Sequence, residues 1–290
     1  MLSIKPNFAR TGSCFERDIP HLQELIEESR EKDIKTDPFP IEVVKTIAKY
    51  VETHPNPFGA AEWKKYFGVD VGPEPEFKEG FEAWWHGPDP IDPSKFVCET
   101  HLPPILAPQF LRNEQGIFPR TLDTLEKMGL GFSTLGFSTS GVGRNFQNIK
   151  NVVADPSHWL VMRKDVLARK SRYPDTDTHI PWEHQKQYMK DLNEQTAAGY
   201  EAEPSMIDLA TVIFARYVWT GEKHLGSGLD GEEGRATLSY CSEYMQCLNP
   251  HCSFPFIFGG LHESNGKIRT FVDCGRDNSS ATGIAALRKF

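Results

Sequence analysis

The sequence predicts an α+β fold in which helices come first and a later helix packs on a mostly antiparallel sheet. Three observations support this. Apolar residues recur at helical spacing within the first 60 residues, and the middle of the chain is irregular and rich in proline and aromatic residues. Three β-rich runs then follow a long apolar helix near the end. We therefore expect a helical N-terminal segment over residues 1–60 and an α+β domain over residues 61–290.

The N-terminal segment contains two predicted amphipathic helices. Residues 19–31 carry leucines and an isoleucine on one face, among many charged residues. The second helix covers residues 41–52 and follows Pro40, which a helix tolerates in its first turn. Prolines and a glycine interrupt the chain at residues 54–59, and a short helix is expected around residues 60–67.

Residues 68–108 are expected to form an ordered but irregular segment wrapped over a core. The stretch holds many prolines, yet it also holds phenylalanines and tryptophans, which flexible linkers lack because nothing buries them. Turns are predicted at Pro88-Asp89-Pro90 and at Asp92-Pro93. Of the adjacent Trp84 and Trp85, one is expected to be buried and the other half-buried.

A mobile glycine-rich loop is predicted over residues 129–145, after a short helix at residues 121–128. The tetrapeptide Gly-Phe-Ser-Thr occurs twice in it, at residues 131–134 and 136–139. We expect this loop to mark the boundary between the two halves of the chain.

Residues 204–221 carry the strongest helix signal. Ser205 is a candidate N-cap, with Asp208 three residues later. The expected buried stripe of this helix consists of Ile207, Thr211, Phe214 and Val218. A polar helix is expected over residues 183–196, and a short buried strand over residues 159–162.

The predicted sheet lies mainly in the last quarter of the chain. The β-rich runs cover residues 237–245, 254–261 and 267–273, and Asn265-Gly266 between the last two signals a hairpin turn. Residues 282–287 are nearly all apolar, so we expect a final strand there that is covered on both faces beneath the helix at 204–221.

Composition excludes several classes of function. Hydrophobic residues make up 39% and charged residues 25% of the 290 residues, which is typical of a globular protein. A net charge of −8 argues against a nucleic-acid partner, because phosphate binding needs clustered Lys and Arg. No apolar run is long enough to insert into a membrane, and the N-terminus does not resemble a secretory signal. We expect a cytoplasmic protein with reduced thiols.

No cofactor is predicted, and no catalytic signature is present. Two Cys/His clusters offer weak metal candidates, namely Cys98, His101, Cys247 and Cys252. Neither cluster has the paired Cys-x-x-Cys spacing of a zinc site, so we favour no metal and ordinary buried thiols. The sequence contains neither a Gly-x-Ser-x-Gly elbow nor a complete phosphate-binding loop.

Several stretches together resemble a family of uncharacterised proteins from amoeba-associated, obligately intracellular bacteria. They are EWKKYFGVDVGPEP at residues 62–75, CETHL at 98–102, HWLVMRKDVL at 158–167, YEAEP at 200–204 and TGIAALRKF at 282–290. The resemblance covers roughly residues 55–290. It implies no activity, but it implies a location in the bacterial cytoplasm or, for a secreted effector, in the host cytosol.

The N-terminal segment also resembles the opening helix of an F-box, as some members of that family do. An F-box begins with Leu-Pro-x-Glu followed by apolar residues at helical spacing, and here phenylalanine replaces the leucine. Pro40, Glu42, Ile47 and Val51 match this pattern. The residues that we predict to bind a protein partner are these four together with Val44.

The sequence thus favours a protein–protein interaction module, either a host-directed effector or a protein similar to a ubiquitin-ligase adaptor. The alternative is an enzyme of unrecognised type, a hydrolase or a thiol-dependent enzyme, with a site in a cleft lined by residues 81–101. The sequence does not indicate an oligomeric state.

Overall fold

The structure is a computed structural model, and it describes residues 57–134, 142–167, 182–222, 238–246, 253–264, 267–274 and 282–290. The chain divides into two compact units, Met1–Pro55 and Asn56–Phe290, and every described residue belongs to the second. The helices predicted at residues 19–31 and 41–52 therefore lie outside the described residues.

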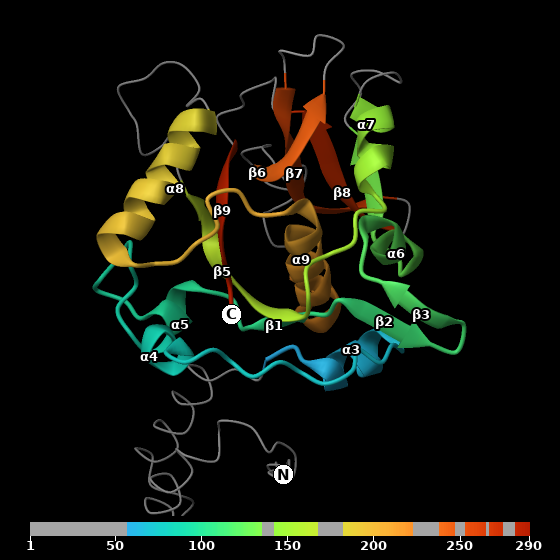
Figure 1. The fold of residues 1–290 in the computed structure, drawn as a ribbon, viewed down its shortest axis with the longest axis horizontal. Helices are drawn as coiled ribbons and strands as arrows, with labels where there is room; N and C mark the ends of the chain where they lie inside the picture. Colours follow the sequence, from blue (N-terminus) through green and yellow to red (C-terminus); the bar gives the residue numbers. More distant parts are fainter. Residues whose placement is uncertain are drawn as a thin grey trace, which may run out of the picture. The chain divides into compact units, whose positions relative to one another are not determined.

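A seven-stranded mixed sheet forms the frame of the second unit (Figure 1). Its strand order is β1-β5-β9-β6-β7-β8-β4. Neighbouring strands are antiparallel except at β6–β9 and β4–β8, so the predicted α+β fold with a mostly antiparallel sheet is confirmed. The strands are β1 Ile105–Ala107, β4 Gly131–Thr134, β5 His158–Leu167, β6 Leu238–Gln246, β7 Ser253–Ser264, β8 Lys267–Cys274 and β9 Thr282–Lys289.

Helix α9, Met206–Thr220, runs across the middle of this sheet (Figure 1). The Ser205 hydroxyl caps it by accepting a hydrogen bond from the Asp208 N–H at 3.3 Å, as the sequence predicted, and Gly221 ends it in a left-handed conformation. The predicted one-sided stripe is too narrow, because every residue from 206 to 215 is buried, and it extends too far, because Val218 is only half-buried. Strands β1, β5, β6 and β7 and helices α3, Ala60–Phe67, and α6, Leu122–Lys127, all contact α9.

Strand β9 lies inside the sheet, between β5 and β6. Four successive side chains, from Ile284 to Leu287, are at most 1% exposed, which confirms the predicted strand covered on both faces. The strand is longer than expected, and its pairing continues to Phe290, whose N–H and C=O exchange hydrogen bonds with Trp159 at 3.0 and 3.1 Å.

The proline-rich middle is ordered, as predicted, and contains two short helices, α4 Phe81–Trp85 and α5 Val97–Thr100. Aromatic stacking attaches it to the core: the ring of Phe77 lies 4.1 Å from that of Phe81 and 4.6 Å from that of Trp159. Trp85 is buried and Trp84 is half-buried, which confirms the expectation for this pair.

The predicted glycine-rich loop is wrong for part of its length. Gly131–Thr134 is strand β4, which pairs in parallel with β8, and Val142–Ile149 is helix α7. Burial explains the difference, because Phe132 packs against Phe146 with ring centroids 5.3 Å apart and so anchors a strand despite the flanking glycines. Residues 135–141 lie outside the described residues.

The remaining elements are the two-stranded ribbon of β2 Phe110–Asn113 and β3 Gly116–Pro119, and helix α8 Trp182–Thr196. Strands β7 and β8 pair up to Ser264 and Lys267, the register that the predicted Asn265-Gly266 turn requires, although the turn itself is not among the described residues. None of the helices that the structure describes is long and apolar enough to cross a membrane.

We predict that Leu287→Ala lowers the free energy of unfolding by about 2–5 kcal/mol, because the change leaves a cavity inside the sheet. Urea unfolding measures the loss. Ile117→Ala removes the same number of carbon atoms from a side chain that is 58% exposed, and it should cost less than about 0.5 kcal/mol. Equal losses for the two variants would contradict the central position of β9.

Candidate functional site

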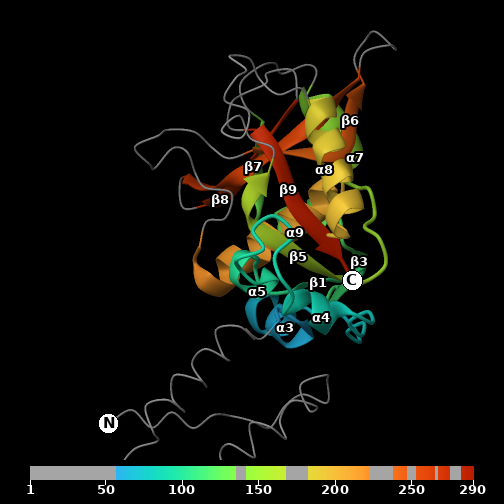
Figure 2. The ribbon, with the colours of Figure 1, turned by 90° about the vertical axis from the view of Figure 1, so that its left-hand side faces the viewer.

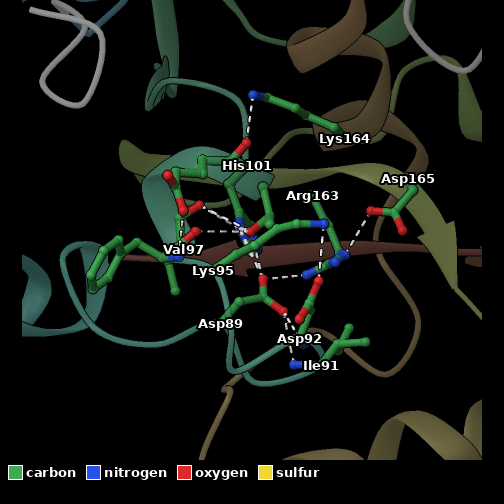
Figure 3. A network of polar contacts seen from close by, with 12 residues as sticks. Asp89, Ile91, Asp92, Lys95, Val97, His101, Arg163, Lys164 and Asp165 are labelled. Carbon is green, nitrogen blue, oxygen red and sulfur yellow. Dashed lines mark hydrogen bonds and ion pairs between the residues drawn. The ribbon is translucent and has the colours of Figure 1, made fainter. Parts of the chain in front are cut away.

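A closed cluster of polar side chains joins the proline-rich segment to the sheet (Figure 3). Asp89, Thr100 and His101 come from this segment, Arg163 from β5, and Tyr200 from the residues after α8. All five are buried. Isolated polar groups are costly to bury, so a cluster of this size in the core requires partners for its charges.

Asp89 organises the turn that the sequence predicted around it. Its Oδ1 accepts hydrogen bonds from the N–H groups of Ile91 and Asp92, each at 2.8 Å, and its Oδ2 accepts one from the Thr100 hydroxyl at 2.5 Å. Oδ2 also pairs with the Arg163 guanidinium. Burial alone would raise the pKa of the Asp89 carboxyl, but these hydrogen bonds and the charge of Arg163 outweigh it and lower the pKa.

His101 is a neutral imidazole. Burial lowers its pKa from 6.5 to about 4. Its Nδ1 lies 3.0 Å from the carbonyl oxygen of Val97 and its Nε2 lies 2.8 Å from the Tyr200 hydroxyl. With the proton on Nδ1, the ring donates to Val97 and accepts from Tyr200. Burial also raises the pKa of Tyr200, so the phenol keeps its proton.

This cluster has little capacity for acid–base or thiol chemistry. Its side chains are shielded from solvent, and both His101 nitrogens already have partners. Burial raises the pKa of the nearby Cys98 thiol, which disfavours the reactive thiolate. The cluster instead fixes residues 88–101 against β5 and the chain after α8.

The metal candidates are only partly placed. Cys98 and His101 are both buried in this region, whereas Cys247 and Cys252 lie outside the described residues. No group of three or more His, Cys, Asp or Glu side chains suited to a metal ion occurs in the part of the chain that the structure describes.

A second buried cluster surrounds Asp208 in the first turn of α9. The Arg120 guanidinium, fully buried, places both terminal nitrogens 3.0 Å from Asp208 Oδ1 and also donates to Thr211 Oγ1 at 2.8 Å. Lys289 Nζ lies 2.9 Å from the other carboxylate oxygen, and His158 Nε2 lies 3.5 Å from Oδ1. Burial opposes ionisation of Asp208, but these neighbours outweigh it and hold its pKa far below the ordinary value.

Exposed apolar side chains gather at one place in the described part of the chain. Of the five large hydrophobic side chains that are exposed there, four lie on the β2–β3 ribbon or beside it: Phe110, Ile117, Val152 and Val153, which are 47%, 58%, 56% and 51% exposed. We call these four the ribbon surface. Only Phe96 lies elsewhere.

Hydrogen bonds place the two valines next to the ribbon. The Ala154 N–H donates to the carbonyl of Arg120, the residue after β3, and the Arg120 N–H donates to the carbonyl of Gln109, the residue before β2. The chain between α7 and β5 therefore passes close to Gln109 and Arg120, where the ribbon begins and ends. Figures 1 and 2 show strand β3 of the ribbon from two directions.

The residues predicted to bind a partner, Pro40, Glu42, Val44, Ile47 and Val51, belong to the unit Met1–Pro55 and lie outside the described residues. In the predicted 81–101 site, His86 Nε2 lies 3.4 Å from a carboxylate oxygen of Glu82, and His86 is not among the buried residues of the Asp89 cluster.

The sequence did not predict three buried contacts: Arg163 with Asp89, Tyr200 with His101, and Arg120 with Asp208. The two residues of each pair lie at least 74 positions apart along the chain, and no local sequence pattern links residues so far apart. The one available signal was the sequence Pro88-Asp89-Pro90, which predicted the turn but not the arginine.

No family model matches the chain, and neither a curated protein nor a solved structure matches it. The resemblance to proteins of amoeba-associated bacteria, and to an F-box, therefore stays a prediction.

We predict that His101 makes the stability of the protein depend on pH. Because the folded-state pKa of His101 lies near 4 and its ordinary value is 6.5, the unfolded chain binds the proton more readily between these values. His101 therefore contributes stability above pH 6.5 that is lost as the pH falls toward 4, about 2 kcal/mol between pH 7 and pH 5. Urea unfolding at both pH values should give this loss, reduced in His101→Gln and unchanged in His184→Gln, which alters an exposed histidine.

We also predict that breaking the ion pair between Arg120 and Asp208 lowers the free energy of unfolding. Asp208→Asn leaves the buried Arg120 charge without its counter-ion and should cost about 3–5 kcal/mol of unfolding free energy. The double variant Arg120→Met/Asp208→Leu should recover much of this loss, because it removes both charges from the core. Asp123→Asn breaks an exposed pair with Lys127 and should cost less than about 1 kcal/mol by the same denaturation measurement.

Proposed function

We propose that this protein is a protein–protein interaction module that binds a partner through the ribbon surface. The gathering of exposed apolar side chains at the β2–β3 ribbon carries the proposal. Single exposed hydrophobic residues are common on any protein, but a concentration of them in one place is typical of interaction sites.

The energetics agree with this role. Full burial of a Val, Ile or Phe side chain contributes about 1.5–3 kcal/mol of stabilisation. Each of these four side chains still exposes about half of its surface, which a partner can cover. Interfaces also favour aromatic residues and arginine at their centres, and Phe110 and Arg112 both lie on strand β2.

The N-terminal segment is proposed to form a second contact with a protein partner. The resemblance of residues 39–51 to an F-box helix supports a second contact through Pro40, Glu42 and Ile47, with an adaptor of the ubiquitin system. The wider family resemblance supports action as an effector in the host cytosol.

The alternative of an enzyme lined by residues 81–101 has weaker support. The side chains there with the most suitable chemistry, Asp89 and His101, are buried and mutually satisfied, and the Cys98 thiol has a raised pKa. Catalysis needs such groups to meet a substrate.

Ile117→Asp tests the role of the ribbon surface, because a carboxylate there opposes apolar docking while the folded chain tolerates it at an exposed position. In pull-downs from amoeba lysate, the host that the resemblance implies, we expect this variant to lose partners that the unchanged chain recovers. Phe96→Asp places the same charge on an exposed apolar residue elsewhere and should leave recovery intact. Equal recovery by both variants would exclude the ribbon surface as the binding site.

Ile47→Asp tests the N-terminal contact separately. We expect it to lose a different subset of partners from that lost by Ile117→Asp, with an unchanged melting temperature for the second unit. Recovery identical to that of the unchanged chain would remove the predicted helix at residues 41–52 from the proposed function.

A further inference from the structure

We propose that residues 88–101 form an acid-released segment, which protonation of His101 detaches from strand β5 while the rest of the fold stays intact. The ribbon surface takes no part in this release, so the proposed function and the acid-released segment can fail separately. Two features support the proposal: the segment has few attachments to the sheet, and a second proton on His101 weakens them.

The acid-released segment is a loop closed on itself that continues into helix α5. Pro88 and Phe96 form an isolated bridge at the base of the loop. Beside it, the Val97 N–H donates to the carbonyl of Gly87 at 3.0 Å. These backbone hydrogen bonds hold the loop together, but they do not attach it to the sheet.

Side chains of the polar cluster make most of the polar connection to the sheet. Among the described residues, the backbone of the segment meets β5 at the segment's end, where His101 and Arg163 form an isolated bridge and the next residue, Leu102, donates its N–H to β5. Within the cluster, Asp89 pairs with the Arg163 guanidinium, and His101 Nε2 lies 2.8 Å from the Tyr200 hydroxyl.

Apolar burial adds little to these attachments. Val97 and Cys98 are the buried hydrophobic side chains of the segment, whereas ten successive residues of α9 are buried. Opening the segment therefore uncovers much less apolar surface than unfolding the chain does. An opening that exposes less apolar surface requires less free energy, so the segment can open locally.

A second proton on His101 removes one of the attachments. A carbonyl oxygen can only accept, so the neutral ring donates to Val97 from Nδ1 and accepts the Tyr200 O–H at Nε2. A protonated ring carries an N–H at both nitrogens, and a hydroxyl cannot donate to an N–H. The hydrogen bond from Tyr200 is then lost, and a further positive charge lies among buried side chains.

The charges that face His101 do not compensate for its burial. Asp89 Oδ2, 3.8 Å from Nδ1, attracts a proton, and so does the more exposed Asp165. The Arg163 guanidinium pairs with both carboxylates and repels a proton. Tyr200 adds no charge, because burial raises its pKa. Burial outweighs the two attractions and lowers the pKa of His101 to about 4, so protonation favours a state in which the ring meets water.

Release of the segment returns the imidazole to water, where its pKa has the ordinary value of 6.5. With a pKa of about 4 in the closed state, the ratio of open to closed molecules should rise about twentyfold between pH 7 and pH 5. Asp89 does not contribute in this interval, because its pKa is lowered from 3.8 and the carboxyl stays ionised.

Thiol labelling of the full chain distinguishes local release from global unfolding. Cys98 lies in α5, within the segment, and Cys241 lies in β6, and both are buried. Dithiodipyridine, a disulfide reagent that also reacts in acid, is applied at low concentration, where the labelling rate follows the open fraction. Peptide mass spectrometry gives the rate at each cysteine, which is divided by the rate in urea-unfolded chain at the same pH.

We expect the corrected rate at Cys98 to rise about twentyfold from pH 7 to pH 5 and to level off near pH 4, as one titrating group requires. At pH 5, Cys98 should be labelled at least about tenfold faster than Cys241, because local opening is more frequent than unfolding. Low concentrations of urea should accelerate Cys241 steeply and Cys98 only weakly, because the effect of urea scales with the surface that is exposed.

His101→Gln assigns the effect to the titrating group. The glutamine amide can donate to Val97 and accept from Tyr200, but it does not titrate. In this variant the rates at Cys98 at pH 7 and pH 5 should agree within about twofold. His184→Gln, which alters an exposed histidine on α8, should keep the twentyfold rise. Near-ultraviolet circular dichroism and the rate at Cys241 check that each variant is folded.

Equal corrected rates at Cys98 and Cys241 would overturn the proposal, because they would show that the whole fold opens at once. A rate at Cys98 that does not depend on pH would also overturn it. So would a rise that His101→Gln leaves unchanged, since another group would then be responsible. The comparison of the two cysteines uses the unchanged chain and is decisive even where a variant fails to fold.

Discussion

The ion pair between Arg120 and Asp208 places a permanent positive charge inside the core, and the elements around α9 are arranged so that this charge is balanced. An arginine cannot escape burial by losing its proton, so its counter-ion has to be held in place by the fold. Asp208 sits in the first turn of α9, where the helix dipole also favours a carboxylate. The guanidinium donates as well to the carbonyl of Pro108, just after β1, at 2.7 Å. Helix α9 is therefore fixed along its axis relative to the chain around β1 and β2.

The Asp89 cluster applies the same principle to a segment with almost no regular structure. Residues 88–101 make few ladder hydrogen bonds, and their position depends on a carboxylate that binds two backbone N–H groups and an arginine from β5. Buried ion pairs of this kind add little net stability compared with apolar packing, but breaking one is costly, so they define a single arrangement of the chain. The Asp89 and Asp208 clusters thus hold irregular segments of the chain in fixed positions against the sheet and helix α9.

Many helices and strands could be predicted from the sequence, because short local patterns of apolar and capping residues determine where they form. The cap at Ser205, the apolar run at residues 282–287 and the β-rich runs before it are all signals within a few residues. Strand β4 could not be recognised, since its glycines signal a loop and its partner Arg269 lies far along the chain. The same limit hid the partners of Asp208 and Asp89. The ribbon surface was hidden for another reason: exposure depends on what the rest of the fold leaves uncovered, and Phe110 and Ile117 resemble core residues in the sequence.

The interior position of β9 has a consequence for how the protein reaches its native state. Strand β9 pairs with β5 on one side and with β6 on the other, and it begins more than 35 positions beyond the end of β6. Until β9 is in place, β5 and β6 are therefore not connected through the sheet. Contacts between such distant parts of a chain form slowly, because loop closure has to precede them. During that interval β5 and β6 each present an open backbone edge with apolar side chains beside it, the kind of surface on which chaperones act and aggregates begin. Assembly of this sheet therefore waits on its last strand, and the yield of folded protein depends on how quickly that strand is inserted.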